Sequence, residues 1–138
     1  MRVQIYDHLP EEAKQIREEV FMEEQGFQIE FDDIDGKATH LVLFDGERPV
    51  ATCRFFPLDE EGFYSIGRVA VPKEYRGKHL GKETMLAAEE CIRKQGGTAV
   101  KLSGQLQAAV FYEKLGYTRY GDVYPDEGCP HIALKKTL

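Results

Sequence analysis

The segment from Val69 to Lys82 contains residues whose types and spacing could bind a phosphorylated ligand. An apolar run ends at Pro72, and a short loop with Gly77 and Gly81 leads into a helical pattern. The first N–H groups of a helix have no intrahelical partner and lie at the positive end of its dipole, while glycine lets an anion approach the backbone. Four basic residues share this segment: Lys73, Arg76, Lys78 and Lys82. In a chain of net charge −6 this indicates an anion cradle, with a solvated basic turn as the alternative.

The composition limits the classes of function. We expect 138 residues, 42% hydrophobic and 30% charged, to form a single domain spanning 1–138. The 24 acidic residues outnumber the 18 basic ones, which argues against non-specific nucleic-acid binding. The chain lacks an apolar run near the roughly 20 residues of a membrane span, and its start alternates like a strand, so we expect a cytoplasmic protein. The three cysteines have no CxxC spacing, so we expect no metal site and no disulfide framework.

Hydrophobic periodicity predicts the element order β-α-β-β-β-α-β-α-β-β. Strands are expected at 2–6, 39–44, 50–56, 64–71, 98–102, 117–123 and 131–135, and helices at 10–26, 80–95 and 106–115. An irregular acidic stretch occupies 28–37. Because a helix connects 64–71 to 98–102, these two strands should be parallel in a sheet whose first half is antiparallel. The apolar stripe of the helix at 80–95 is expected at Leu80, Thr84, Ala87 and Cys91.

Two motifs on these elements resemble the GNAT superfamily of acyl-CoA-dependent N-acyltransferases. The family's pyrophosphate loop runs Gln/Arg-x-x-Gly-x-Gly/Ala, and residues 76–81 read Arg-Gly-Lys-His-Leu-Gly, with His79 where the family usually has its first glycine. Residues 105–117 resemble the family segment Asn-x-x-Ala-x-x-Leu/Phe-Tyr-x-x-x-Gly-Phe. Residues 17–26 and 126–132 resemble the ElaA-type branch in particular, so the resemblance covers nearly the whole chain.

The resemblance implies an α/β (α+β) fold, with a mixed, mostly antiparallel central sheet flanked by helices and a splayed pair of parallel strands. It implies transfer of an acetyl group from acetyl-CoA to a primary amine by direct attack on the thioester. A bulge near Gly67 would free the N–H of Val69 to polarise the thioester oxygen. The residues expected to contact the cofactor are Val69, Ala70, Val71, Arg76, Gly77, Lys78, His79, Leu80, Gly81, Lys82, Gln105 and Tyr112.

The same resemblance suggests the proton-transfer groups. Tyr112 is the expected general acid, because a phenol with a pKa of about 10 is protonated near pH 7. His131 is the expected base, and the alternatives are His40, Glu24, the acidic run at 32–35 and a water chain. We expect the backbone N–H of His79, rather than its imidazole, to meet the phosphate.

Two other functions stay open on the sequence alone. Arg17-x-x-Val20-Phe21, the acidic loop and two arginines within strands, Arg54 and Arg68, are also similar to acyl-homoserine-lactone synthases, which share the fold but use an acyl carrier protein and S-adenosylmethionine. The second alternative is a non-catalytic acyl-CoA-binding module. The expected partner is a small-molecule or peptide amine, without nucleic acid or membrane, and the sequence leaves the acceptor and homodimer formation open.

Overall fold

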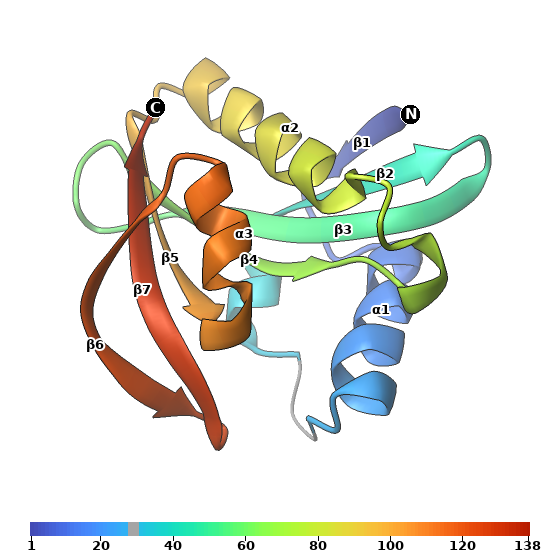
Figure 1. The fold of residues 1–138 in the computed structure, drawn as a ribbon. Helices are drawn as coiled ribbons and strands as arrows, with labels where there is room; N and C mark the ends of the chain where they lie inside the picture. Colours follow the sequence, from blue (N-terminus) through green and yellow to red (C-terminus); the bar gives the residue numbers. More distant parts are fainter. Residues whose placement is uncertain (28–30) are drawn as a thin grey trace.

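The computed structural model describes residues 1–27 and 31–138, which form a seven-stranded mixed sheet with helices packed on it (Figure 1). The strands are β1 (Arg2–Tyr6), β2 (Thr39–Asp45), β3 (Arg48–Pro57), β4 (Phe63–Ala70), β5 (Ala99–Gln105), β6 (Thr118–Asp126) and β7 (Cys129–Thr137). Their order across the sheet is β1-β2-β3-β4-β5-β7-β6. β4 and β5 pair in parallel, as predicted, and the expected fold class is confirmed. Residues 28–30 of the predicted acidic stretch lie outside the described residues.

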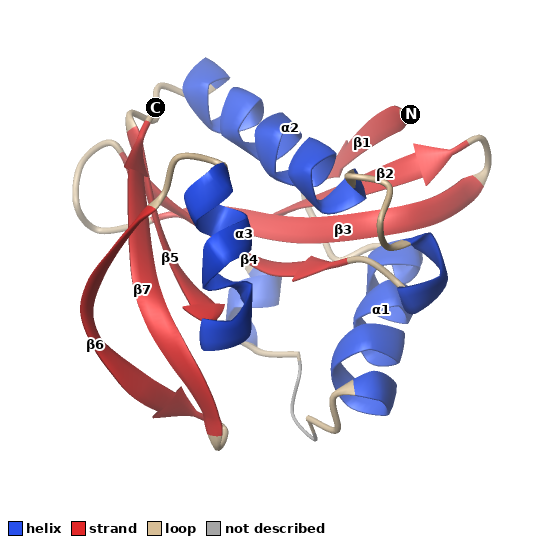
Figure 2. Cartoon of the chain, viewed as in Figure 1, coloured by secondary structure: helices blue, strands red, loops and turns tan. Residues whose placement is uncertain are grey.

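The three α-helices occur in the predicted order along the chain. The helical segments are α1 (Glu11–Arg17), which continues as the π-helix η1 (Glu18–Glu24), the 3₁₀ turns η2 (Asp33–Gly36), η3 (Lys73–Tyr75) and η4 (Leu106–Ala108), and the helices α2 (Leu80–Lys94) and α3 (Ala109–Lys114). Figure 2 shows α2 and α3 on the near face of the sheet. Within the described part of the chain, we find no helix with the length and apolarity that a membrane span requires.

Both faces of β2 are buried, which explains its continuous apolar run. Leu41 and Leu43 belong to the clusters on the α2 side, whereas Val42 and Phe44 pack with Ala13 of α1. Successive side chains of a strand point to opposite faces, so α1 and α2 cover opposite sides of this half of the sheet. The sequence Leu-Val-Leu-Phe therefore reflects two layers of helix rather than one.

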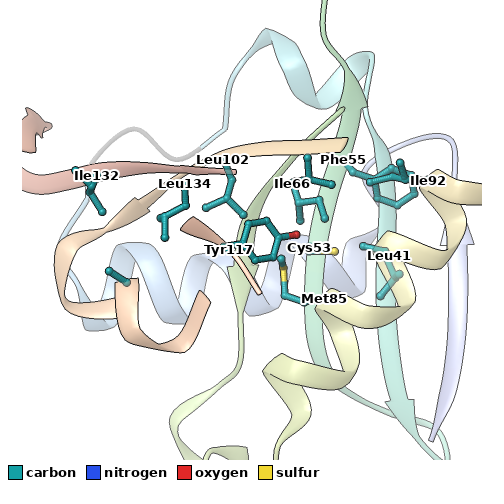
Figure 3. Packing of buried hydrophobic residues seen from close by; sticks show 13 residues of the cluster. Leu41, Cys53, Phe55, Ile66, Met85, Ile92, Leu102, Tyr117, Ile132 and Leu134 are labelled. Carbon is teal, nitrogen blue, oxygen red and sulfur yellow. The ribbon is translucent and has the colours of Figure 1, made fainter. Parts of the chain in front are cut away.

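The buried stripe of α2 differs from the predicted one. Leu80 and Thr84 are buried as expected, but Ala87 and Cys91 are only half-buried, so the prediction for those two positions was wrong. The residues that face the sheet instead are Met85, Ala88, Glu89 and Ile92. Figure 3 shows Ile92 beside Phe55 and Met85 beside Tyr117, all within one core cluster. Methionine and isoleucine bury more apolar area than alanine and cysteine. The buried face of α2 is therefore shifted by one residue from the predicted one.

Glu89 is a charged residue within this core, fully shielded from solvent. Its carboxylate accepts hydrogen bonds from the Tyr117 hydroxyl at 2.7 Å and from Lys136 Nζ at 2.8 Å. Burial, aided by the neighbouring carboxylate, raises the pKa of Tyr117 far above its ordinary value, so the phenol stays a hydrogen-bond donor. This trio fastens α2 to the end of α3 and to β7.

Replacing Glu89 with alanine should lower the free energy of unfolding by about 3 kcal/mol, because it leaves the Lys136 ammonium without its buried partner. Urea denaturation measures the change. The matched control is Glu90→Ala, one position along on the exposed side of α2, which should change stability by less than about 0.5 kcal/mol. Equal losses in the two variants would contradict a stabilising role for the trio.

Candidate functional site

β4 contains one more residue than β3 opposite the site. Gly67 faces Arg54 and Ala70 faces Thr52, so two residues of β4, Arg68 and Val69, lie opposite a single residue of β3. Arg68 has a φ of 51°, in the left-handed region that non-glycine residues rarely occupy. The strand therefore has a β-bulge, with its left-handed residue at Arg68 rather than at the neighbouring glycine.

β4 separates from β5 before it reaches the bulge. The two strands pair only at Phe63–Ala99 and Tyr64–Val100, and no later register pair joins them among the described residues. The later part of β4 lines one side of a cleft of about 920 Å³, and the end of β5 lines the other. Val20, Phe21 and Gln25 of the α1–η1 side also face this cleft. The described strands thus form a wedge that is open to a ligand.

The site residues predicted from the sequence lie together in this cleft. Val69, Tyr112 and His131, the three residues expected to take part in catalysis, all line it. The predicted cofactor contacts line it too, with the exception of Lys78, which is exposed. Gly104, Arg68, Phe21 and Gln25 also line the cleft, although the sequence analysis did not predict them as site residues.

The glycine loop reaches α2 through a strained residue. Gly77 has a φ of 83°, and His79, at the N-cap of α2, has a φ of 62° and a ψ of 23°. The sequence analysis did not predict this left-handed conformation of His79. Such a conformation favours glycine, which explains the residue the family has at this position.

Gly81 allows close packing between α2 and α3. A Cβ atom at this position would lie 3.2 Å from the Phe111 ring of α3, so the two helices meet closely here. The N-terminus of α2 is therefore held beside the helix that carries Tyr112.

Arg76 is held by protein groups on three sides. Its Nη1 and Nη2 each lie 2.6 Å from a carboxylate oxygen of Glu24, and its Nε donates to the Val71 carbonyl at 2.9 Å. The hydrogen bonds from Arg76 lower the pKa of the Glu24 carboxyl, which stays ionised near neutral pH. The guanidinium thus joins the glycine loop to η1.

Tyr112 lies against the backbone of β5. A Cβ atom at Gly104 would lie 2.8 Å from the Tyr112 ring, so the glycine provides the space in which the ring sits. Burial, with a smaller contribution from Cys53, raises the pKa of Tyr112 to about 12. The phenol is therefore protonated near neutral pH, as a proton donor must be.

His131 presents one ring nitrogen to the cleft. Its Nδ1 lies 2.8 Å from the Cys129 carbonyl, and because a carbonyl only accepts, Nδ1 is the protonated nitrogen. In the neutral ring this leaves the lone pair on Nε2, which lies 4.0 Å from an Asp126 carboxylate oxygen. Asp126 and Glu127 line the same end of the cleft.

The other candidate bases lie outside the cleft lining. His40 is buried, donates to the Asp35 carbonyl at 2.9 Å, and has its pKa lowered by burial. Glu24 is paired with Arg76, and the acidic run binds arginines. His131 is therefore the best-placed base among the candidates named from the sequence.

The acidic run closes a buried charge network on the α1 face. Asp35 accepts from Arg17 at 2.8 and 3.0 Å and from Arg54 at 2.9 Å. Asp32 accepts from Arg54 at 2.6 and 3.1 Å and lies 3.4 Å from Arg68. Burial alone would raise the pKa of Asp35, but the two arginines outweigh it and lower that pKa to about 2. The network anchors η2 and the bulge residue to α1 and β3.

Taken together, the strand wedge, the glycine loop at a helix N-terminus and a protonated tyrosine form the arrangement expected of an acyl-CoA-dependent acyltransferase. Residues 3–117 match the acetyltransferase (GNAT) family. The chain belongs to this family.

Relatives match over nearly the full chain. A candidate acetyltransferase of Bacillus subtilis is 39% identical over 129 residues, covering 90% of this chain and 86% of the relative. Protein ElaA of Escherichia coli is 30% identical over 129 residues, which cover 90% of this chain and 84% of ElaA. The crystal structure of ElaA aligns with a TM-score of 0.85 and 26% identity over 98% of both chains. The crystal structure of a candidate N-acetyltransferase from Lactobacillus plantarum aligns with a TM-score of 0.91 and 31% identity. The alignment covers 99% of this chain and 97% of the relative.

More distant structures share the fold alone. An aminoglycoside 6′-N-acetyltransferase complexed with coenzyme A is 17% identical, with a TM-score of 0.77 over 99% of this chain and 97% of its own. A CoA-dependent acyl-homoserine lactone synthase is 18% identical, with a TM-score of 0.80 over 98% and 82%. The predicted resemblance to the GNAT superfamily and to ElaA is confirmed.

The strain at His79 gives a prediction for the loop. His79→Gly should raise the free energy of unfolding by about 0.5–1 kcal/mol, because glycine adopts the left-handed conformation without steric cost. If only the backbone N–H of His79 meets the phosphate, His79→Gly should leave the affinity for CoA nearly unchanged between pH 6 and 8. Thermal unfolding and calorimetric titration measure the two quantities. A steep pH dependence of affinity that vanishes in the variant would instead assign the imidazole to the anion.

The charge network gives a pH-dependent prediction. The pKa of Asp35 in the folded protein, about 2, lies below its ordinary value of 3.8, so its contribution to stability is present above pH 4 and is lost as pH falls towards 2. Above pH 4 the free energy of unfolding of the wild type should exceed that of Asp35→Asn by about 2 kcal/mol. This difference in stability should become smaller at lower pH. Urea denaturation from pH 2 to 6 measures the gap. The control Asp33→Asn alters an exposed residue of the same turn, and a comparable gap there would contradict the prediction.

Proposed function

We propose that this protein transfers an acetyl group from acetyl-CoA to a primary amine within the wedge between β4 and β5. The observation that carries the proposal is the convergence of the bulged strand, the glycine loop and Tyr112 on one cleft. Family membership supports an acyltransferase, and the distant neighbour complexed with coenzyme A supports that cofactor.

The cofactor would lie along three consecutive parts of the cleft. Its pyrophosphate would sit over residues 77–82, where the first N–H groups of α2 and Lys82 offer positive charge. Its pantetheine arm would follow 69–71, the part of β4 that has left β5. The thioester would then lie near Val69, whose N–H would stabilise the developing oxyanion.

The reaction then follows from the groups at the thioester. The amine attacks the carbonyl carbon, a C–N bond forms and the C–S bond breaks. His131 Nε2 takes the proton that the amine must lose, and the Tyr112 hydroxyl protonates the departing CoA sulfur. The products are the amide and free CoA, and solvent exchange returns both side chains to their starting states.

The end of the cleft suits a cationic amine. Asp126 and Glu127 lie beside His131, so an ammonium group would be attracted to the position where it is deprotonated. We therefore propose a small-molecule or peptide amine as the acceptor, and a cytoplasmic reaction on the sequence argument above. The arginines that also suggested a lactone synthase bind Asp32 and Asp35, a structural use that does not require that chemistry.

Two measurements test the proposal. Calorimetric titration of the wild-type protein with CoA should give one binding site per chain, and absence of binding would contradict the proposal. A screen of acetyl-CoA with amines, aminoglycosides, amino sugars, polyamines and peptides, detected by free CoA, should then identify an acceptor. CoA binding without transfer or hydrolysis would favour the non-catalytic module.

Tyr112→Phe should retain the fold and the CoA affinity but lower kcat by roughly 10²–10⁴, because the thiolate then leaves without a proton donor. Steady-state kinetics with the acceptor found by the screen measure the effect. Tyr120→Phe on the exposed strand β6 is the matched control and should leave kcat unchanged. An unchanged kcat in Tyr112→Phe, with chemistry shown to be rate-limiting, would give Tyr112 a packing role only.

A further inference from the structure

The C-terminal end of η1 is tied to both sides of the wedge. Glu24, its last residue, binds Arg76, and Arg76 in turn donates through Nε to Val71 at the end of β4. The next residue, Gln25, accepts a hydrogen bond from Gln105 at 2.8 Å, and Gln105 is the last residue of β5. These contacts span 52 and 80 positions of the sequence, so no local pattern predicts them.

Arg76 is engaged by protein in a way that limits direct phosphate contact. Each of its three guanidinium nitrogens has a partner among Glu24 and Val71. Turning the guanidinium to a phosphate would break these bonds and leave the Glu24 carboxylate near the anionic cofactor without its counter-charge.

The segment held by these contacts forms part of the cleft wall. Phe21 and Gln25 line the same cleft as Val69, the residue proposed to lie at the thioester. η1 is a π-helix of seven residues, and π-helical turns are rare and occur frequently at functional sites. A segment with such irregular backbone geometry depends on tertiary contacts for a fixed position.

We propose that Glu24 and Gln25 form a strap that couples CoA binding at the glycine loop to the position of η1, with Glu24 acting as a positioning residue through Arg76. When the loop is ordered by the pyrophosphate, Arg76 holds Glu24, and η1 is fixed where the acceptor must lie. The inference rests on the proposed function for the location of CoA, and it assigns Arg76 to the loop's geometry rather than to the phosphate.

A double-mutant cycle on CoA affinity tests the strap. Glu24→Gln keeps the shape of the side chain and removes its charge, and Glu23→Gln, at the neighbouring exposed residue, is the matched control. The Kd for CoA should rise about two- to fivefold in Glu24→Gln and stay unchanged in the control. Arg76→Gln should cause a similar rise, and the double variant should add little, because the two side chains act as one unit. The rise should shrink in high salt.

Amide hydrogen exchange distinguishes a local loss of coupling from a general loss of stability. CoA should slow amide exchange across 18–25 in the wild type, and Glu24→Gln should reduce this protection while protection at 77–82 persists. Wild-type or tighter CoA affinity in Glu24→Gln would overturn the strap. So would a much larger loss in Arg76→Gln than in Glu24→Gln, which would return Arg76 to the phosphate. Failure of the wild type to bind CoA would contradict the proposed function instead.

Discussion

The separation of β4 from β5 is the constraint on which the cleft depends. β4 pairs with β5 only as far as Tyr64, keeps its register with β3 through Gly67, and then has one extra residue at the bulge. β5 continues along β7 with seven register pairs, so its other edge remains satisfied. The wedge is therefore a property of the sheet itself, and a ligand can reach backbone groups there that an intact sheet would use.

The charge network on the α1 side of the sheet holds Arg68, the left-handed residue of the bulge. Arg68 reaches Asp32, which is bound by Arg54 of the neighbouring strand, while Asp35 binds Arg17 of α1. Breaking a buried pair of this kind costs more than the pair itself contributes, because a charge is left without a partner. The network thus specifies one position for the bulge, and the strap formed by Glu24 and Gln25 would extend that order to the cleft wall.

Much of the fold could be predicted from the sequence because local patterns determine it. Alternation and helical spacing gave the order of the elements, and the helix between 64–71 and 98–102 implied the parallel pair that the structure contains. The stripe of α2 was misplaced because spacing alone does not weigh side-chain size, and because Glu89 is buried only through its distant partners Tyr117 and Lys136.

The site was predicted through motifs rather than through contacts. Residues of the glycine loop and Tyr112 could be named because their segments resemble the family, and they line one cleft. The pairing of Arg76 with Glu24 could not be predicted, since it depends on how η1 packs near the end of β4. The backbone angles of His79 likewise follow from the path between η3 and α2, which spacing does not specify.

The most direct test of the account is a crystal structure of the protein with CoA. The account predicts that the pyrophosphate accepts hydrogen bonds from backbone N–H groups within 77–82, and that the pantetheine arm lies between β4 and β5 beside Val69 and Val71. CoA bound at another surface, or a pantetheine arm that lies outside the wedge, would contradict it.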